Sequence, residues 1–179
     1  MQTRKMLSRA ALVVLPLAAL GAVAWTPADH GSRIAGTISS QFSSMQTQEV
    51  GDVPGHTIAL ARSQGTNRNT GPTEFMDGAD IVNIETNDLV QGNGTHQGYV
   101  TFSRDGQSTI SSWSGKVTTV LGPDQRLATT IEGTWTTIGG TGRYAGAKGR
   151  GTYRGHMLSE KEVSVDWAGE LSGVKVAAR

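Results

Sequence analysis

Hydrophobic and polar residues alternate with a period of two over much of the C-terminal half of the chain. Leu127, Ile131 and Trp135 fall on one face of their segment, and charged or small polar residues occupy the other. The same alternation returns further on, where Val165 and Trp167 share a face. Alternation over this length is typical of a strand with one buried and one solvated face. It predicts an antiparallel sheet.

Shorter segments rich in Val, Ile, Thr, Trp and Tyr precede this region, with turn residues between them, which is typical of a sandwich or barrel. The strands predicted there cover residues 33–42, 56–63, 80–86, 91–103 and 109–121. Asp105-Gly106 predicts a tight hairpin between the last two. The polar, turn-rich residues 64–72 predict a long loop. Apolar positions change face between Ile110 and Trp113, which predicts a β-bulge near Ser111–Ser112.

The most glycine-dense stretch of the chain runs from Gly133 to Gly155 and invites comparison with a nucleotide-binding turn. The spacing between Gly140 and Gly146 differs by one residue from the dinucleotide-binding fingerprint, and no Gly-Lys-Ser/Thr follows. A helix would have to come next for its N-terminus to hold phosphate. The three glycines of residues 148–155 would destabilise such a helix by on the order of 3 kcal/mol. The stretch therefore does not predict a phosphate site.

A structural interpretation of these glycines is better supported. Three glycines of the segment 148–155 share one face with Tyr153, so most of that face carries no side chain. Large side chains from neighbouring strands can then lie across it, and the sheet can bend sharply. Trp135 and Trp167 are placed to supply those side chains, and Tyr144 is placed to plug one end. The pattern indicates a small closed barrel.

The segment from Trp135 to Tyr153, with its Gly-Gly-Thr-Gly-Arg-Tyr-Ala-Gly-Ala-Lys-Gly-Arg-Gly core, resembles the signature of bacterial proteins with the allene oxide cyclase-like barrel. Dirigent proteins share that barrel and carry a related segment. Gly92-Asn-Gly94 and the Asp105-Gly106 hairpin also occur where that pattern places them, and the resemblance covers residues 79–171. It implies an all-β fold, a closed antiparallel eight-stranded barrel of allene oxide cyclase type, over residues 33–179. Plant members cyclise a fatty-acid epoxide or steer a radical coupling by confinement. None of their catalytic residues matches a position here.

The N-terminal residues differ from the rest in composition. Residues 1–9 carry three basic residues and no acid, an apolar run follows over residues 10–23, and Ala22-Val23-Ala24 fits a signal-peptidase site. We therefore expect a signal peptide at residues 1–24, a leader at 25–32 and a secreted or periplasmic barrel. The apolar run is shorter than the roughly 20 residues of a membrane span, so no stable membrane insertion is expected after cleavage. The alternative is an uncleaved membrane anchor.

Removing the first 24 residues takes three positive charges from the formal charge of +1 and leaves about −2. A nearly neutral surface argues against nucleic acid as a partner. The chain has no cysteine, so its stability has to come from packing and strand pairing. The four histidines are isolated in sequence, so no metal site is predicted, and no cofactor is expected.

One acidic residue stands out as candidate chemistry. Glu85 shares a face with Ile81 and Asn83, opposite Val82 and Ile84. If that face is inward, burial would raise the pKa of Glu85 and suit it to general acid or base catalysis, with Asn83 orienting a ligand carbonyl. We favour the other orientation, in which Val82 and Ile84 point inward and Glu85 points to water.

The candidate ligand-binding residues are Asn83 and four aromatic residues, Tyr99, Trp113, Trp135 and Trp167. Tyr153 joins Glu85 as a candidate catalytic residue. The same aromatic residues could instead fill an eight-stranded barrel, which has little spare interior. Three functions stay open: binding or confinement of a small hydrophobic molecule, a cyclase or isomerase using Glu85 or Tyr153, and a filled structural or interaction protein assembling as a homodimer or homotrimer.

Overall fold

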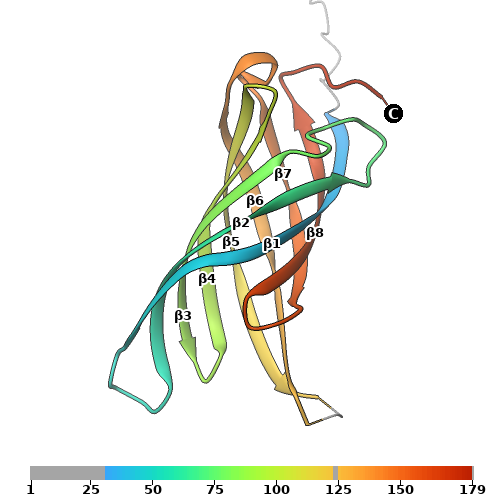
Figure 1. The fold of residues 1–179 in the computed structure, drawn as a ribbon. Helices are drawn as coiled ribbons and strands as arrows, with labels where there is room; N and C mark the ends of the chain where they lie inside the picture. Colours follow the sequence, from blue (N-terminus) through green and yellow to red (C-terminus); the bar gives the residue numbers. More distant parts are fainter. Residues whose placement is uncertain (1–30, 123–124, 179) are drawn as a thin grey trace, which may run out of the picture.

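The computed structural model describes residues 31–122 and 125–178, which form a closed antiparallel barrel of eight strands. The predictions of a signal peptide at residues 1–24 and of most of the leader at 25–32 lie outside the described residues. Each strand pairs with its sequence neighbours, and β8 returns to pair with β1 (Figure 1). The strands are β1 (Ser32–Glu49), β2 (His56–Asn69), β3 (Asp80–Val90), β4 (Asn93–Arg104), β5 (Gln107–Leu121), β6 (Leu127–Gly140), β7 (Lys148–Met157) and β8 (Glu162–Ser172).

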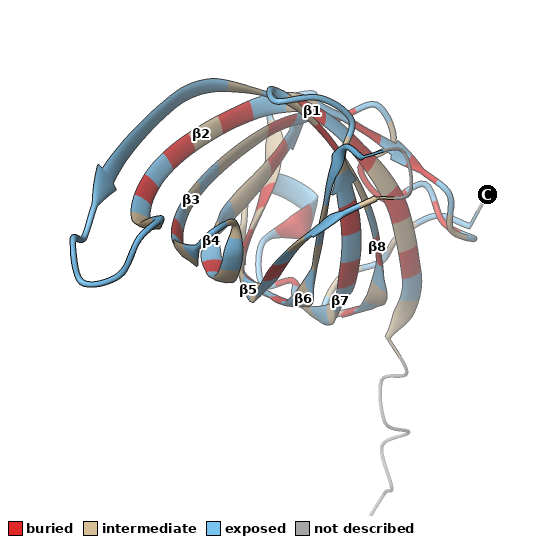
Figure 2. Ribbon diagram, turned by 90° about the horizontal axis from the view of Figure 1, so that it is seen from below, coloured by how far each residue is buried: buried red, intermediate tan, exposed pale blue. Residues whose placement is uncertain are grey.

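The predicted barrel is therefore confirmed, and its alternation is visible as bands of buried and exposed residues along the strands (Figure 2). The Asp105-Gly106 hairpin is also confirmed. Both residues have positive φ, 51° and 74°, the conformation of a tight hairpin turn. Among the described residues, no helix is long and apolar enough to cross a membrane.

The loop predicted over residues 64–72 is wrong, because β2 continues to Asn69. A polar sequence forms a strand here because its inward side chains are hydrogen-bonded. The amide of Asn67 donates to the Met76 carbonyl at 2.8 Å and accepts from the Trp167 indole N–H at 3.0 Å. Asn69 donates to the Phe75 carbonyl at 3.0 Å. Both side chains are almost fully buried, which is tolerated because each is paired.

The bulge lies on a different strand from the one predicted. Ile110 pairs with Gly139 and Ser111 pairs with Thr137, so the extra residue is Ile138 of β6. β5 itself keeps its alternation, with Ser111 buried inside the barrel. Ile110 faces away from that interior, so an apolar residue on the outer face produced the apparent change of parity.

One end of the barrel is closed by a packed aromatic cluster. Phe75, from the segment between β2 and β3, contacts Tyr144, Trp167 and Phe102 with ring centroids 5.5, 5.9 and 6.3 Å apart. Tyr144 lies in the short 3-10 helix Gly142–Tyr144 and is almost fully buried. These contacts confirm the predicted plug, with Phe75 as the residue that the sequence did not identify.

At the other end, the β1–β2 hairpin extends beyond the closed part of the barrel (Figure 1). The β1–β8 ladder stops at Gln41–Glu162, after which β1 pairs only with β2. His56 links this hairpin to β3, because its two ring nitrogens lie 2.6 Å from Asp52 and 2.8 Å from Asp88. These carboxylates, Asp88 first, raise the pKa of His56. The ring therefore bridges the hairpin turn and β3, and its protonation strengthens both contacts.

Candidate functional site

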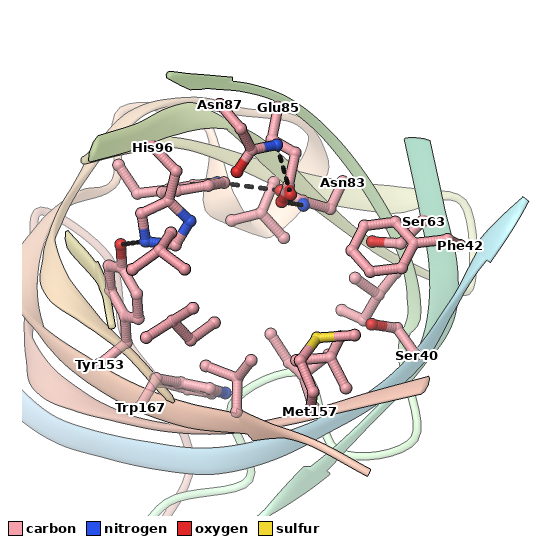
Figure 3. Close-up of a pocket in the computed structure, with 18 of the residues that line it drawn as sticks. Ser40, Phe42, Ser63, Asn83, Glu85, Asn87, His96, Tyr153, Met157 and Trp167 are labelled. Atoms are coloured by element: carbon pink, nitrogen blue, oxygen red, sulfur yellow. Dashed lines mark hydrogen bonds between the residues drawn. The ribbon is translucent and has the colours of Figure 1, made fainter. Parts of the chain in front are cut away.

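The barrel encloses a cavity of about 370 Å³ that is lined mainly by apolar side chains (Figure 3). The Phe75 cluster closes one end of it. The lining reaches Gly92 and Glu160, which lie in turns at the opposite end. A cavity of this size with a few convergent polar groups is typical of a small-molecule site. The interior is therefore not filled, which argues against the alternative of a structural protein with a filled barrel.

Four of the predicted aromatic residues line the cavity, and glycines explain how they fit. Trp135 lies across Gly151 and Gly169, which pair with each other on β7 and β8, and a Cβ on either would lie 2.6 Å from the indole. Tyr153 lies in the same way across the paired Gly115 and Gly133. The other two residues, Trp113 and Trp167, lie over Gly98 and Gly36. The packing predicted for Trp135 over the glycines of residues 148–155 is confirmed at Gly151, whereas Trp167 lies over Gly36 of β1 and not over that segment.

The fifth candidate aromatic residue, Tyr99, does not line the cavity. Its side chain is 55% exposed on the outer face of β4, where it pairs across the ladder with Ile84. It borders an outer groove instead. The prediction failed because Tyr99 has the opposite strand parity from Val100 and Phe102, which line the cavity. An aromatic residue in a strand indicates a half-buried surface without saying which side of the barrel it faces.

The orientation favoured for Glu85 from the sequence is wrong. Ile81 is only 2% exposed, Ile84 is 45% exposed, and Glu85 lines the cavity with Asn83 and Asn87. Both faces of β3 carry apolar and polar residues, so its hydrophobic pattern did not distinguish inside from outside. The two faces of β3 differ because the inward polar residues are hydrogen-bonded to one another, and the strand pattern alone does not show this.

A directed chain of hydrogen bonds holds Glu85. The indole N–H of Trp113 donates to Asn83 Oδ1 at 2.9 Å, and Asn83 Nδ2 donates to Glu85 Oε2 at 2.8 Å. An indole N–H can only donate, so it determines which end of the Asn83 amide is the oxygen. Asn83 must then present its N–H groups to Glu85. Asn87 donates to Glu85 Oε1 at 3.2 Å, so each carboxylate oxygen has one protein donor.

The pKa of Glu85 results from two opposed effects. Burial in the barrel raises the pKa, because the charged form loses water, and the amides of Asn87 and Asn83 partly offset this by donating to the carboxylate. The net shift is upward. A carboxyl group with a raised pKa in an apolar cavity can take up and release a proton closer to neutral pH than an exposed one.

His96 and Tyr153 form a second polar pair on the cavity wall, and the sequence did not identify His96. Tyr153 Oη lies 2.9 Å from His96 Nε2. Burial lowers the pKa of His96 to about 4, so the imidazole is neutral at physiological pH. Burial, and then the charge of Glu85, raise the pKa of Tyr153. The parity that His96 shares with Val100 and Phe102 on β4 was the signal that could have found it.

Removing the Asn83 amide tests this arrangement. In Asn83→Leu, Glu85 loses a donor that favours its charged form, so its pKa is expected to rise further. Trp113→Phe, which frees the Asn83 amide to rotate, is expected to raise it less. The Glu85 side-chain carboxyl ¹³C shift, followed against pH, measures this. Tyr99→Phe on the outer face is the control and leaves the titration unchanged. An unaltered or lowered pKa in Asn83→Leu would show that the amide does not support the carboxylate.

Comparison with known proteins adds little to this geometry. No family model matches the chain, and no curated protein matches its sequence. Among solved structures, the pterocarpan synthase dirigent protein GePTS1 is similar, with a TM-score of 0.43 and 14% sequence identity. The match covers 84% of this chain and 91% of that chain. Similarity at this level shows neither a shared activity nor shared site residues. In the described part of the chain, no group of three or more His, Asp and Glu side chains is placed to hold a metal ion.

Proposed function

We propose that this protein binds a small, largely apolar molecule inside its barrel, as an exported member of the allene oxide cyclase-like and dirigent-like barrels. The observation that carries the proposal is the cavity of about 370 Å³, closed at one end by the Phe75 cluster and lined by aromatic and aliphatic side chains. Transfer of an apolar molecule from water into such a lining is favourable. Export rests on the composition of residues 1–24.

Binding is tested with N-phenyl-1-naphthylamine, an apolar fluorescent probe that is uncharged at neutral pH. We expect the probe to bind the natural protein with an increase in fluorescence. Ala59 lines the cavity, and Ala59→Trp should fill part of it and weaken binding by about tenfold or more. The next residue, Leu60, is exposed on the outer face, so Leu60→Trp is the matched control and should bind as the natural protein does. Absence of probe binding, or equal binding by a folded Ala59→Trp, would contradict the proposal.

A second candidate function is proton-transfer catalysis on the bound molecule, as in an isomerase or cyclase. The position of Glu85 favours it, because its carboxyl group is buried, has a raised pKa and is held by two amides. Tyr153, with its raised pKa, suits a hydrogen-bond donor better than a base. Glu85→Gln should then retain binding and lose conversion, followed by mass spectrometry of host lipid extracts incubated with each protein. Identical product profiles would leave binding as the only function.

A further inference from the structure

The charges along the cavity wall are all of one sign. Among the described residues that line the cavity, the acidic side chains are Glu85 and Glu160, and none is lysine or arginine. His96, the one imidazole of this lining, is neutral above about pH 4. An ionised Glu85 therefore faces the cavity with no cationic side chain in the wall around it.

Glu85 also keeps acceptor capacity for a ligand. An ionised carboxylate has about four lone-pair sites on its two oxygens. Asn83 and Asn87 occupy one on each oxygen, at 2.8 and 3.2 Å. The remaining lone-pair sites of Glu85 are left for a ligand, and the same two amides hold the carboxylate in position. A buried carboxylate without a positive partner is destabilised by several kcal/mol through lost hydration, and a charged donor within hydrogen-bond distance offsets that loss.

Aromatic rings surround the same part of the cavity. The rings of Trp113 and Tyr153 are 5.7 Å apart at 78°, and His96 packs edge-on against both, 4.7 Å from Trp113 and 5.9 Å from Tyr153. Trp113 is joined to Glu85 through Asn83. Indole and phenol faces attract organic cations, and more strongly where water is excluded. The wall next to Glu85 thus combines a negative group with indole and phenol rings, a combination that suits an alkylammonium group.

We propose that the molecule held in the barrel is a lipophilic amine, whose ammonium group pairs with Glu85 among the Trp113 and Tyr153 rings. Its apolar part would lie along the aliphatic lining, which includes Val100, Ile131 and Val165. This inference rests on the proposed binding function and gives it a ligand class. It predicts discrimination against carboxylates, which would meet Glu85 with a charge of the same sign.

The test compares octylamine, octanol and octanoate, which share one chain and differ in the head group. Each is titrated against N-phenyl-1-naphthylamine bound to the natural protein at pH 7.5. We expect octylamine to displace the probe at least about tenfold more tightly than octanol, and octanoate to be the weakest. In Glu85→Gln the advantage of octylamine over octanol should disappear, while octanol changes by less than about twofold. Glu160→Gln, at the barrel mouth, should retain most of the advantage.

A measurement on the natural protein alone keeps the proposal testable if Glu85→Gln does not fold. Lowering the pH from 7.5 through the titration of Glu85, located by its carboxyl ¹³C shift, protonates the carboxyl, so octylamine should bind more weakly while octanol is unaffected. His96 stays neutral above about pH 4. Equal binding of octylamine and octanol, or no effect of pH on octylamine, would overturn the amine and leave the apolar site standing. Failure of every compound, the probe included, would overturn the proposed function as well.

Discussion

Replacement of Gly151 by alanine is expected to destabilise the barrel by about 3 kcal/mol. A Cβ at this position would overlap the Ala168 carbonyl oxygen of β8 and lie 2.6 Å from Trp135 Cζ2. The backbone of a paired strand cannot move away without breaking its ladder. The indole is also held, because its N–H donates to the Thr152 carbonyl at 3.2 Å. Urea denaturation of the two proteins measures the difference in the free energy of unfolding.

Gly139→Ala is the matched control for this substitution. Gly139 also lies within a strand without a positive φ, but its nearest neighbour would be the Ile110 side chain at 3.2 Å, which can adjust. We expect its cost to stay below about 1 kcal/mol. If Gly151→Ala costs as little as Gly139→Ala, the strand tolerates a Cβ at Gly151 and the indole does not require glycine there.

Phe75→Ala is expected to have the largest effect of any single truncation, about 3–5 kcal/mol. Phe75 is buried, touches three other aromatic rings and joins the segment after β2 to the barrel end. Its removal would leave a hole where no neighbour can collapse without losing ring contacts. Tyr99→Ala is the control, since that ring is 55% exposed and its loss should cost less than about 1 kcal/mol.

Phe75→Ala also tests the connection between the stability of the barrel and ligand binding in the cavity. Phe75 belongs to the lining of the cavity as well as to the cluster that closes it. If the Phe75→Ala protein is folded under the conditions of the binding assay, N-phenyl-1-naphthylamine should bind to it more weakly, because water can enter at the end that Phe75 closes. A loss of stability below about 1 kcal/mol would contradict the view that Phe75 closes the barrel. Retained stability together with lost probe binding would restrict its role to the cavity.

Much of the fold could be predicted because it depends on local pattern. The alternation from Thr129 to Trp135 and the Asp105-Gly106 turn are properties of adjacent residues, and both predictions hold. Leu127, at the start of β6, is exposed and departs from the predicted pattern. The glycines opposite Trp135 could also be predicted, since they share parity with Tyr153 on one strand. The loop predicted over residues 64–72 failed because the partners of Asn67 are distant, the furthest being Trp167. A polar segment predicts a loop when its distant hydrogen-bond partners cannot be identified from the sequence.

The candidate site could be predicted less well. Glu85 and Asn83 were recognised as a pair, but their orientation was predicted the wrong way, and His96 was not connected to Tyr153. Whether a face of β3 points inward depends on its pairing with β2 and β4 and on the curvature of the whole sheet. Neither is encoded in the order of residues along β3 itself.

By itself, the sequence determined that this chain forms antiparallel strands, where several of them turn, and that glycines make room for aromatic rings. These follow from backbone conformation and side-chain size, which act between residues close in the chain. Only the tertiary structure decided that the barrel keeps a cavity and that Glu85 faces it. Closing β1 against β8 determines the inner surface, and the identity of the groups on that surface then determines charge, burial and the ligand that can enter.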